Sequence, residues 1–135
     1  MRSRLAFAVI STLTVSSAAA QDMIKGVYSR SQEQCAAAKQ DFQAFIENGE
    51  TVLTPRGIEG IEYNCEFLDW KMATRSPGAI VTALCEEPGY AYPQVFAMMP
   101  RGEGELELSL SLAEGASGEP GNAGMYHLCE GVSVP

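Results

Sequence analysis

The stretch Ile58–Cys85 constrains the fold most, because it holds two strand-like runs, a turn between them and two of the four cysteines. In the first run, apolar residues alternate with polar ones as in a half-buried strand, and the apolar side carries Ile61, Tyr63, Cys65 and Phe67. The second run, residues 79–85, is apolar and rich in strand-forming residues. Ser76-Pro77-Gly78 supplies the turn. The stretch therefore predicts an antiparallel hairpin.

The register of this hairpin brings two cysteines together. If the hairpin folds symmetrically about Arg75, Cys65 faces Cys85 and Phe67 faces Ala83. Opposed β-carbons in an antiparallel pair lie about 4.5 to 5.5 Å apart, so a disulfide needs only a slight local closing. We therefore predict a disulfide between Cys65 and Cys85.

The residues that follow Phe67 cannot all keep the alternation of one regular strand. Trp70 and Met72 fall out of phase with Cys65 and Phe67, although all four are apolar. A bulge near Leu68 restores the phase, and bulges often lie beside binding sites. We therefore predict that Leu68, Trp70 and Met72 contribute to a binding site.

Cys35 and Cys129 remain for a second disulfide. Their bond would close almost the whole folded chain into one loop, a constraint worth about 4 to 5 kcal/mol, against about 3 kcal/mol for the Cys65–Cys85 loop. The alternative is a metal site. The cysteines form no C-x-x-C pair and the sequence has one histidine, His127. We therefore expect two disulfides, no metal and no cofactor.

Residues 1–20 have the composition of a secretory signal peptide. Two arginines precede an apolar run, and the small residues Ala18-Ala19-Ala20 follow it. We expect cleavage near Ala20, which leaves residues 21–135 as a single disulfide-stabilised domain in the periplasm or outside the cell. The apolar run is too short to span a bilayer, so we expect no membrane insertion of the mature chain.

The charge of the chain disfavours two classes of partner. The full sequence carries a net charge of −8. Loss of Arg2 and Arg4 with the leader leaves seven basic and seventeen acidic residues, a net charge of −10. Such a surface repels the phosphates of nucleic acids and of anionic membranes, so we expect neither as a partner.

Residues 31–48 predict one amphipathic helix. Ser31 and Gln34 form a capping box, and apolar residues recur at intervals of three and four up to Glu47. Asn48-Gly49 supplies a stop signal. Cys35 lies on the apolar stripe, so we expect its disulfide to join the first turn of the helix to the last strand.

Further strands are predicted around this helix and hairpin. Residues 105–112 alternate four leucines with four polar residues, and shorter strand signals cover residues 94–99 and 125–129, while residues 24–28 and 51–54 carry weaker ones. We therefore predict an α+β fold: an antiparallel sheet of five or six strands, strongly curled or partly closed as a barrel, with one N-terminal helix packed on it.

Catalytic motifs are not found in the sequence. It contains no G-x-S-x-G elbow, no H-E-x-x-H motif, no glycine-rich phosphate loop and no free thiol paired with a histidine once both disulfides form. We therefore expect no enzyme activity and name no catalytic residue.

Short segments resemble two families. Gly26-Val27-Tyr28 is similar to the G-x-W opening of lipocalin-type barrels, with tyrosine in place of tryptophan. Tyr63-Asn64-Cys65 is similar to the Tyr-x-Cys entry of periplasmic lysozyme inhibitors, and Ser117-Gly118 resembles their Ser-Gly loop. Each similarity covers only a few residues. The second implies that Ser117 and Gly118, within the glycine-rich loop 113–124, contact a partner enzyme.

Two functions are compatible with these features. The first is a non-catalytic protein-binding module whose acidic surface meets a basic partner, for example an inhibitor of a lysozyme. The second is a binder of a small apolar ligand in a pocket of the sheet lined by Tyr63, Phe67, Trp70 and Met99. A purely structural envelope protein, whose core those side chains fill, is the third interpretation.

Overall fold

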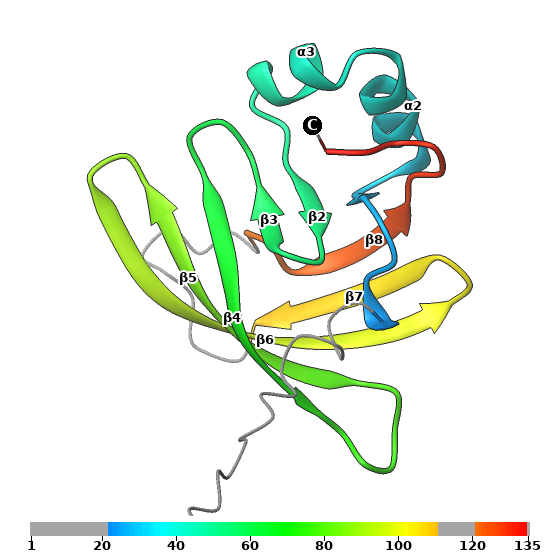
Figure 1. Ribbon diagram of the computed structural model, residues 1–135, viewed down its shortest axis with the longest axis vertical. Coiled ribbons are helices and arrows are strands. Elements are labelled where there is room, and N and C mark those ends of the chain that lie inside the picture. The colour runs from blue at the N-terminus through cyan, green and yellow to red at the C-terminus, as the bar shows by residue number, and fades with distance from the viewer. Residues whose placement is uncertain (1–21, 111–120, 135) are drawn as a thin grey trace, which may run out of the picture.

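The computed structural model describes residues 22–110 and 121–134, which form a closed antiparallel β-barrel (Figure 1). Within these ranges eight strands follow one another around the barrel, and β1 pairs with β8 to close it. The strands are β1 (Tyr28–Ser29), β2 (Val52–Thr54), β3 (Gly57–Glu59), β4 (Asn64–Met72), β5 (Ala79–Glu87), β6 (Tyr90–Gly102), β7 (Glu105–Leu110) and β8 (Gly124–Leu128).

The expectation of five or six strands was too low. The strands expected over residues 24–28 and 51–54 correspond to β1 and β2, although β1 begins only at Tyr28. Strand β3 was not expected, because its three residues are too few for a period-2 pattern to stand out. Hydrogen bonding to adjacent strands defines these short strands, and the pairing of β1 with β8 closes the barrel.

The predicted hairpin is confirmed as β4 and β5. Cys65 pairs with Cys85 and Phe67 with Ala83, and a disulfide joins the two cysteines. The register then shifts between Phe67 and Asp69, which confirms the predicted bulge near Leu68.

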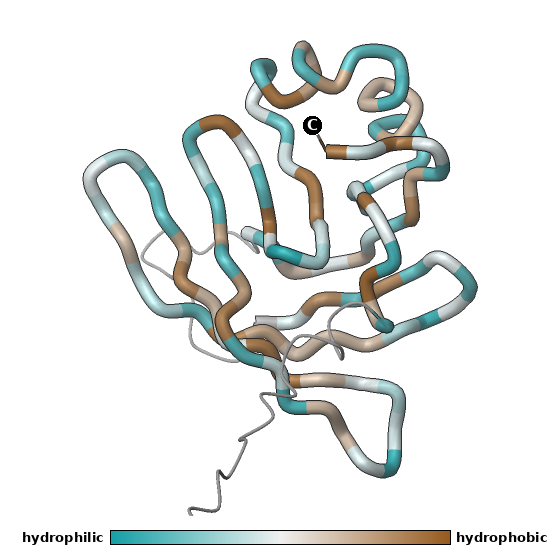
Figure 2. Tube along the Cα trace, in the orientation of Figure 1, coloured by the Kyte–Doolittle hydropathy of each residue, from teal (hydrophilic) through white to brown (hydrophobic). Residues whose placement is uncertain are grey.

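The barrel interior is a packed core. Large side chains with essentially no exposed surface come from strands all around the barrel and from the segment before β1; they include Ile24, Leu53, Phe96, Met98, Leu108 and Tyr126. Figure 2 shows hydrophobic residues along the strands, while the helical segment mixes hydrophobic and hydrophilic residues. A barrel of eight strands has an interior just wide enough for the inward-facing side chains to fill it.

Residues 31–48 form two short helices in place of the single helix expected. Helix α2 (Gln32–Gln40) ends at Asp41, and α3 (Phe42–Glu47) begins there. Asp41 has an extended backbone, and its carboxylate accepts a hydrogen bond from the Ala44 amide at 2.9 Å. Aspartate is a good N-cap and a poor helix former, so it starts a new helix where periodicity alone predicted continuation.

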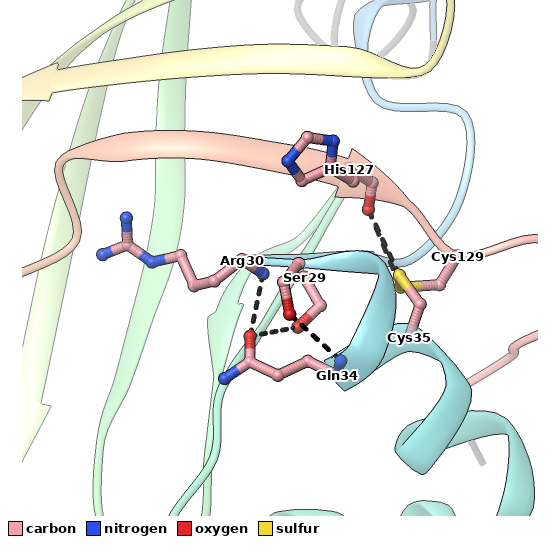
Figure 3. Close-up of a disulfide and its surroundings, with 7 residues drawn as sticks. Ser29, Arg30, Gln34, Cys35, His127 and Cys129 are labelled. Atoms are coloured by element: carbon pink, nitrogen blue, oxygen red, sulfur yellow. Dashed lines mark hydrogen bonds between the residues drawn. A yellow bond between two sulfur atoms is a disulfide. The ribbon is translucent and has the colours of Figure 1, made fainter.

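The predicted N-cap of α2 is confirmed, although its partner residue acts differently. The Ser31 hydroxyl accepts from the Gln34 amide at 3.1 Å. The Gln34 side-chain oxygen accepts from the Arg30 amide at 3.1 Å and from the Ser29 hydroxyl at 3.0 Å, so it caps the residues before Ser31 (Figure 3).

The helices cover one side of the barrel. A second apolar cluster, outside the barrel, packs Ala38 and Phe45 of the helices against Val52 of β2 and against Val27, the residue before β1. The predicted Cys35–Cys129 disulfide is confirmed and joins α2 to the end of β8. None of the helices in the described ranges is long and apolar enough to span a lipid bilayer.

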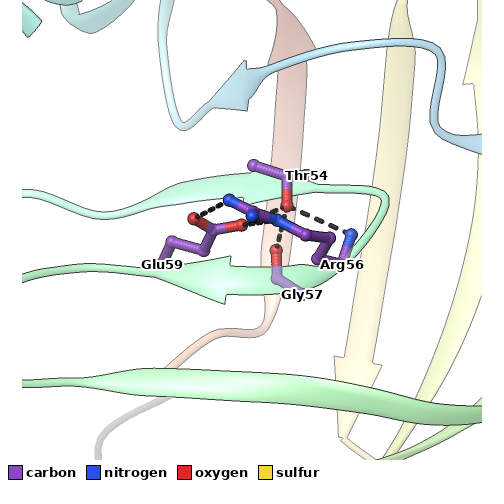
Figure 4. A network of polar contacts seen from close by, with 4 residues as sticks. All are labelled: Thr54, Arg56, Gly57 and Glu59. Carbon is purple, nitrogen blue, oxygen red and sulfur yellow. Dashed lines mark hydrogen bonds and ion pairs between the residues drawn. The ribbon is translucent and has the colours of Figure 1, made fainter. Parts of the chain in front are cut away.

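The β2–β3 turn is held by a local polar network (Figure 4). Arg56 forms a bidentate pair with Glu59, with N–O distances of 3.1 and 2.9 Å. The Thr54 hydroxyl lies 2.7 Å from a Glu59 carboxylate oxygen and accepts from the Arg56 amide at 3.2 Å. This network keeps two very short strands in register.

Candidate functional site

The bulge in β4 places one leucine on the outside of the barrel. Phe67 packs against the core, and after the shift in register Trp70 and Met72 pack against it as well. Leu68 is the extra residue, and 58% of its surface is exposed. A bulge re-aims side chains in this way because two residues of one strand oppose a single residue of its partner.

The outer sides of β5 and β6 are also mostly apolar, although Thr82 lies between Ile80 and Leu84 on β5. In both strands the buried residues alternate with more exposed ones, which face away from the core. Ile80 of β5 is 45% exposed and lies beside Ala97 of β6, and Leu84 lies beside Pro93. We call the following set the apolar outer face: Leu68, Ile80, Leu84, Pro93, Val95 and Ala97.

No described element outside the sheet covers the apolar outer face. Helix α2 contacts β1 and β8, and Figure 1 shows both helices on the β2 and β8 side of the barrel. The outer surfaces of the first strands are buried there by the helices. The fold therefore covers one apolar outside surface and leaves the other accessible, which is a typical feature of interaction sites.

Acidic side chains flank the apolar outer face. Glu66 pairs with Leu84 across the β4–β5 ladder, Asp69 lies two register positions further on, and Glu86 lies near the end of β5. All three are exposed, and none forms a salt bridge with another described residue. Lys71 adds one positive charge to this row. The flank is therefore net negative.

Arg30 fixes the residues that precede β8. Its guanidinium donates to the Ala123 carbonyl at 2.6 Å and to the Gly121 carbonyl at 2.5 Å. The same group lies over the Tyr126 ring, 4.6 Å from its centroid. One side chain therefore ties the start of the helical segment to the entry of the last strand.

Two tyrosines complete this contact at the same end of the barrel. The Asn122 side-chain amide donates to the Tyr63 hydroxyl, and the Tyr126 hydroxyl donates to the Asn122 carbonyl at 3.0 Å. Burial, followed by the neighbouring Tyr92, raises the pKa of Tyr63 well above its usual value. Burial raises the pKa of Tyr126 to about 12, although Arg30 opposes the shift. Both phenols are therefore protonated at neutral pH and serve as hydrogen-bonding groups.

His127 lies in a cleft between α2 and the β6–β7 turn, with a volume of about 610 Å³. Its Nδ1 is 3.4 Å from a Glu105 carboxylate oxygen. The serine opposite it in the ladder, Ser29, is fully buried, and its hydroxyl donates to Gln34 (Figure 3). Within the described ranges no group of three or more His, Cys, Asp or Glu side chains is placed to hold a metal ion.

The residues predicted as a binding site from sequence are divided by the bulge. Leu68 is on the apolar outer face. Trp70 is on the inner side, where its ring meets Phe67 edge-on at a centroid distance of 5.5 Å, and Met72 packs on the inner side too. Ser117 and Gly118 lie outside the described residues.

Most of the apolar outer face was missed by sequence reasoning. Its signal is present in residues 79–85, where both phases of the strand are apolar: Ala79, Val81, Ala83 and Cys85 on one side, Ile80 and Leu84 on the other. Such a strand is either covered on both faces or exposes an apolar surface. Only the position of the helices decides between these two outcomes.

Comparison of the chain with protein-family models, with characterised proteins and with solved structures finds no match in any of the three.

Proposed function

We propose that this protein is exported and acts as a non-catalytic protein-binding module. The observation that carries the proposal is the apolar outer face, which no described helix or loop covers and which carboxylates flank. Specific protein interfaces have this arrangement, with an apolar centre and a polar rim.

The charge of the surface favours a basic partner. The whole chain has a net charge of −8, and the row beside the apolar outer face holds three carboxylates and one lysine. A basic protein would be steered toward this row by long-range attraction. A lysozyme, which the protein would inhibit, is the partner class that we propose to test first.

The construction of the domain supports a binding role. The strands that carry the apolar outer face, β4, β5 and β6, are the longest described, and one of the two disulfides joins β4 to β5. A surface held rigid before binding loses little conformational freedom when the complex forms. Two disulfides are also typical of an oxidising compartment, in accord with the proposed leader over residues 1–20 and a periplasmic or secreted location.

A direct test measures binding and inhibition of a lysozyme by the purified chain and by Leu68→Asp. A charge at the centre of an interface is expected to weaken binding at least about tenfold, because it would be desolvated without a partner. Ile61→Asp is a matched control, since Ile61 has the same 58% exposure but lies outside the apolar outer face.

The proposal predicts that Leu68→Asp loses inhibition and that Ile61→Asp keeps it. Unchanged lysozyme rates at micromolar excess of the original chain would exclude lysozymes as the partner. Equal effects of the two substitutions on any basic partner would contradict the proposed surface.

The apolar-ligand hypothesis needs a different location from the one first considered. Tyr63, Phe67 and Trp70 pack against the barrel core, and Met99 belongs to the outward phase of β6. Buried side chains occupy the interior, so a ligand would have to enter at one end of the barrel. A purely structural role would leave both the surface and the barrel end without a ligand.

A further inference from the structure

One end of the barrel carries a pocket of about 480 Å³, a size typical of small-molecule sites. It lies where the β4–β5 connection and the β6–β7 turn meet the residues before β1. We call it the mouth pocket. Its apolar walls are formed by Met23, Met72, Pro77, Pro100, Leu106 and Leu128. Methionine side chains adapt easily to the shape of an apolar ligand.

Tyr28 supplies a polar group to this pocket. The residue is only 3% exposed and lines the mouth pocket. Its hydroxyl makes no hydrogen bond to another described residue. Because Tyr28 lines the mouth pocket, its hydroxyl is the polar group that we assign to a ligand there.

Charged residues at the rim determine which charge a ligand's head group can carry. Asp22, Glu103 and Glu105 line the mouth pocket together with Lys25. Three carboxylates and one ammonium give the rim a net negative charge, which disfavours an anionic head group and favours a cationic one.

We propose that the mouth pocket binds a cationic amphiphile, a small molecule with an apolar body and an ammonium group. The apolar body lies against the methionine, proline and leucine walls, and the ammonium donates to the Tyr28 hydroxyl and is neutralised by the rim carboxylates. None of these residues belongs to the apolar outer face, so the site is independent of the proposed protein partner.

Three probes with the same alkyl chain test this site. Decylamine, decanol and decanoate are titrated into the protein by calorimetry at neutral pH, the two ionic probes below their micelle concentrations and decanol below its solubility limit. Decylamine is expected to bind at least about tenfold more tightly than decanol, the factor that a hydrogen bond to a charged group supplies. Decanoate is expected to bind most weakly. Equal binding of the amine and the carboxylate, or no binding of any probe, would overturn the proposal.

Substitutions then locate the site. Tyr28→Phe removes one oxygen and is expected to weaken decylamine at least about tenfold. Met72→Trp fills the pocket from a half-buried position and is expected to weaken all bound probes. Leu68→Trp, on the outer side of the same strand, is the control and leaves decylamine binding unchanged. Circular dichroism verifies folding. If both pocket variants fold and bind decylamine as the original chain does, the mouth pocket is not the site.

Discussion

The guanidinium of Arg30 stacks on the ring of Tyr126, 4.6 Å from its centroid, and links the segment before α2 to the last strand. The same group donates to two carbonyls just before β8, those of Gly121 and Ala123. These contacts join parts of the chain that are more than ninety residues apart in sequence. Arg30 therefore helps to close the barrel.

Replacement of Arg30 is predicted to destabilise the fold. Arg30→Ala removes a cation–π contact and two hydrogen bonds, for a loss of about 2 to 3 kcal/mol in the free energy of unfolding by urea. Arg101→Ala is the control. Its side chain is 53% exposed and, among the described residues, pairs with Glu107 alone, so its loss should stay below about 1 kcal/mol. Equal losses in the two variants would contradict the role of Arg30.

The two disulfides are predicted to differ in their contribution to stability. All four cysteines are buried, so replacing either pair by alanine leaves a similar gap and the loop length decides the difference. The bond between Cys35 and Cys129 spans 94 residues and should contribute about 4 to 5 kcal/mol, while the bond between Cys65 and Cys85 spans 20 and should contribute about 3 kcal/mol. Urea unfolding of the two double variants measures both values. The reverse order would show that loop entropy is not the main term.

Gly57 is predicted to tolerate no side chain. Its φ is +152°, and a β-carbon there would lie 1.8 Å from the Cys65 carbonyl oxygen on the neighbouring strand. Gly57→Ala should cost about 3 kcal/mol or more, through backbone strain and steric overlap together. Gly49→Ala provides the comparison. Gly49 also has a positive φ, of +86°, but a β-carbon there meets no atom within 4 Å, so strain alone should cost about 1 kcal/mol.

Alkaline pH is predicted to destabilise the protein through the buried Tyr126 and the half-buried Tyr63. The folded pKa of Tyr126 is about 12, above the usual 10.0, so the folded state keeps a proton that the unfolded state has already lost. Stability is therefore full below pH 10 and falls as the pH rises from 10 to 12, by up to about 1.4 kcal/mol per pH unit for each such group. Tyr63, whose pKa is raised too, adds to the slope.

Urea unfolding at several alkaline pH values measures this slope. Tyr126→Phe should lower the stability at neutral pH, because the Asn122 carbonyl loses its donor, and should flatten the decline above pH 10. Tyr90→Phe is the control, since Tyr90 is 63% exposed. The same slope in Tyr126→Phe as in the original chain would contradict the assignment.

Association with a basic partner is predicted to depend on salt. Glu66→Lys with Asp69→Lys reverses two exposed charges beside the apolar outer face, and should lower the association rate at low ionic strength with little effect in high salt. Glu33→Lys with Glu47→Lys makes the same change in net charge on the helices. Stopped-flow binding compares the two pairs. If both pairs slow association equally, net charge alone acts and the surface beside β4 has no special role.

Local patterns were sufficient for part of this fold. The alternation around Cys65 and the turn before residue 79 set the register of β4 and β5, and hence one disulfide and the bulge at Leu68. Ser31 marked the start of a helix correctly. At Asp41 a local signal was overlooked, because the apolar period continues past it while its carboxylate caps a second helix.

Of the three β4 residues predicted from sequence as a binding site, only Leu68 lies on the apolar outer face. Leu68 was identified through the bulge, yet Trp70 and Met72 lie on the opposite side of the strand. A period-2 pattern shows which residues share a side, and a bulge exchanges the sides at a single position.

By itself, the sequence determined the paired cysteines, the antiparallel strands with their bulge and the start of the helical segment, because each depends on residues close in the chain or on the pairing of four cysteines. Tertiary structure alone decided that Tyr28 pairs with Leu128 to close the barrel, and that the helices cover the outer side of β1 and β2 and leave Ile80 exposed and Leu84 half-buried. Both outcomes depend on long-range packing. An apolar residue favours burial, but the path of the whole chain determines which surface packs against it.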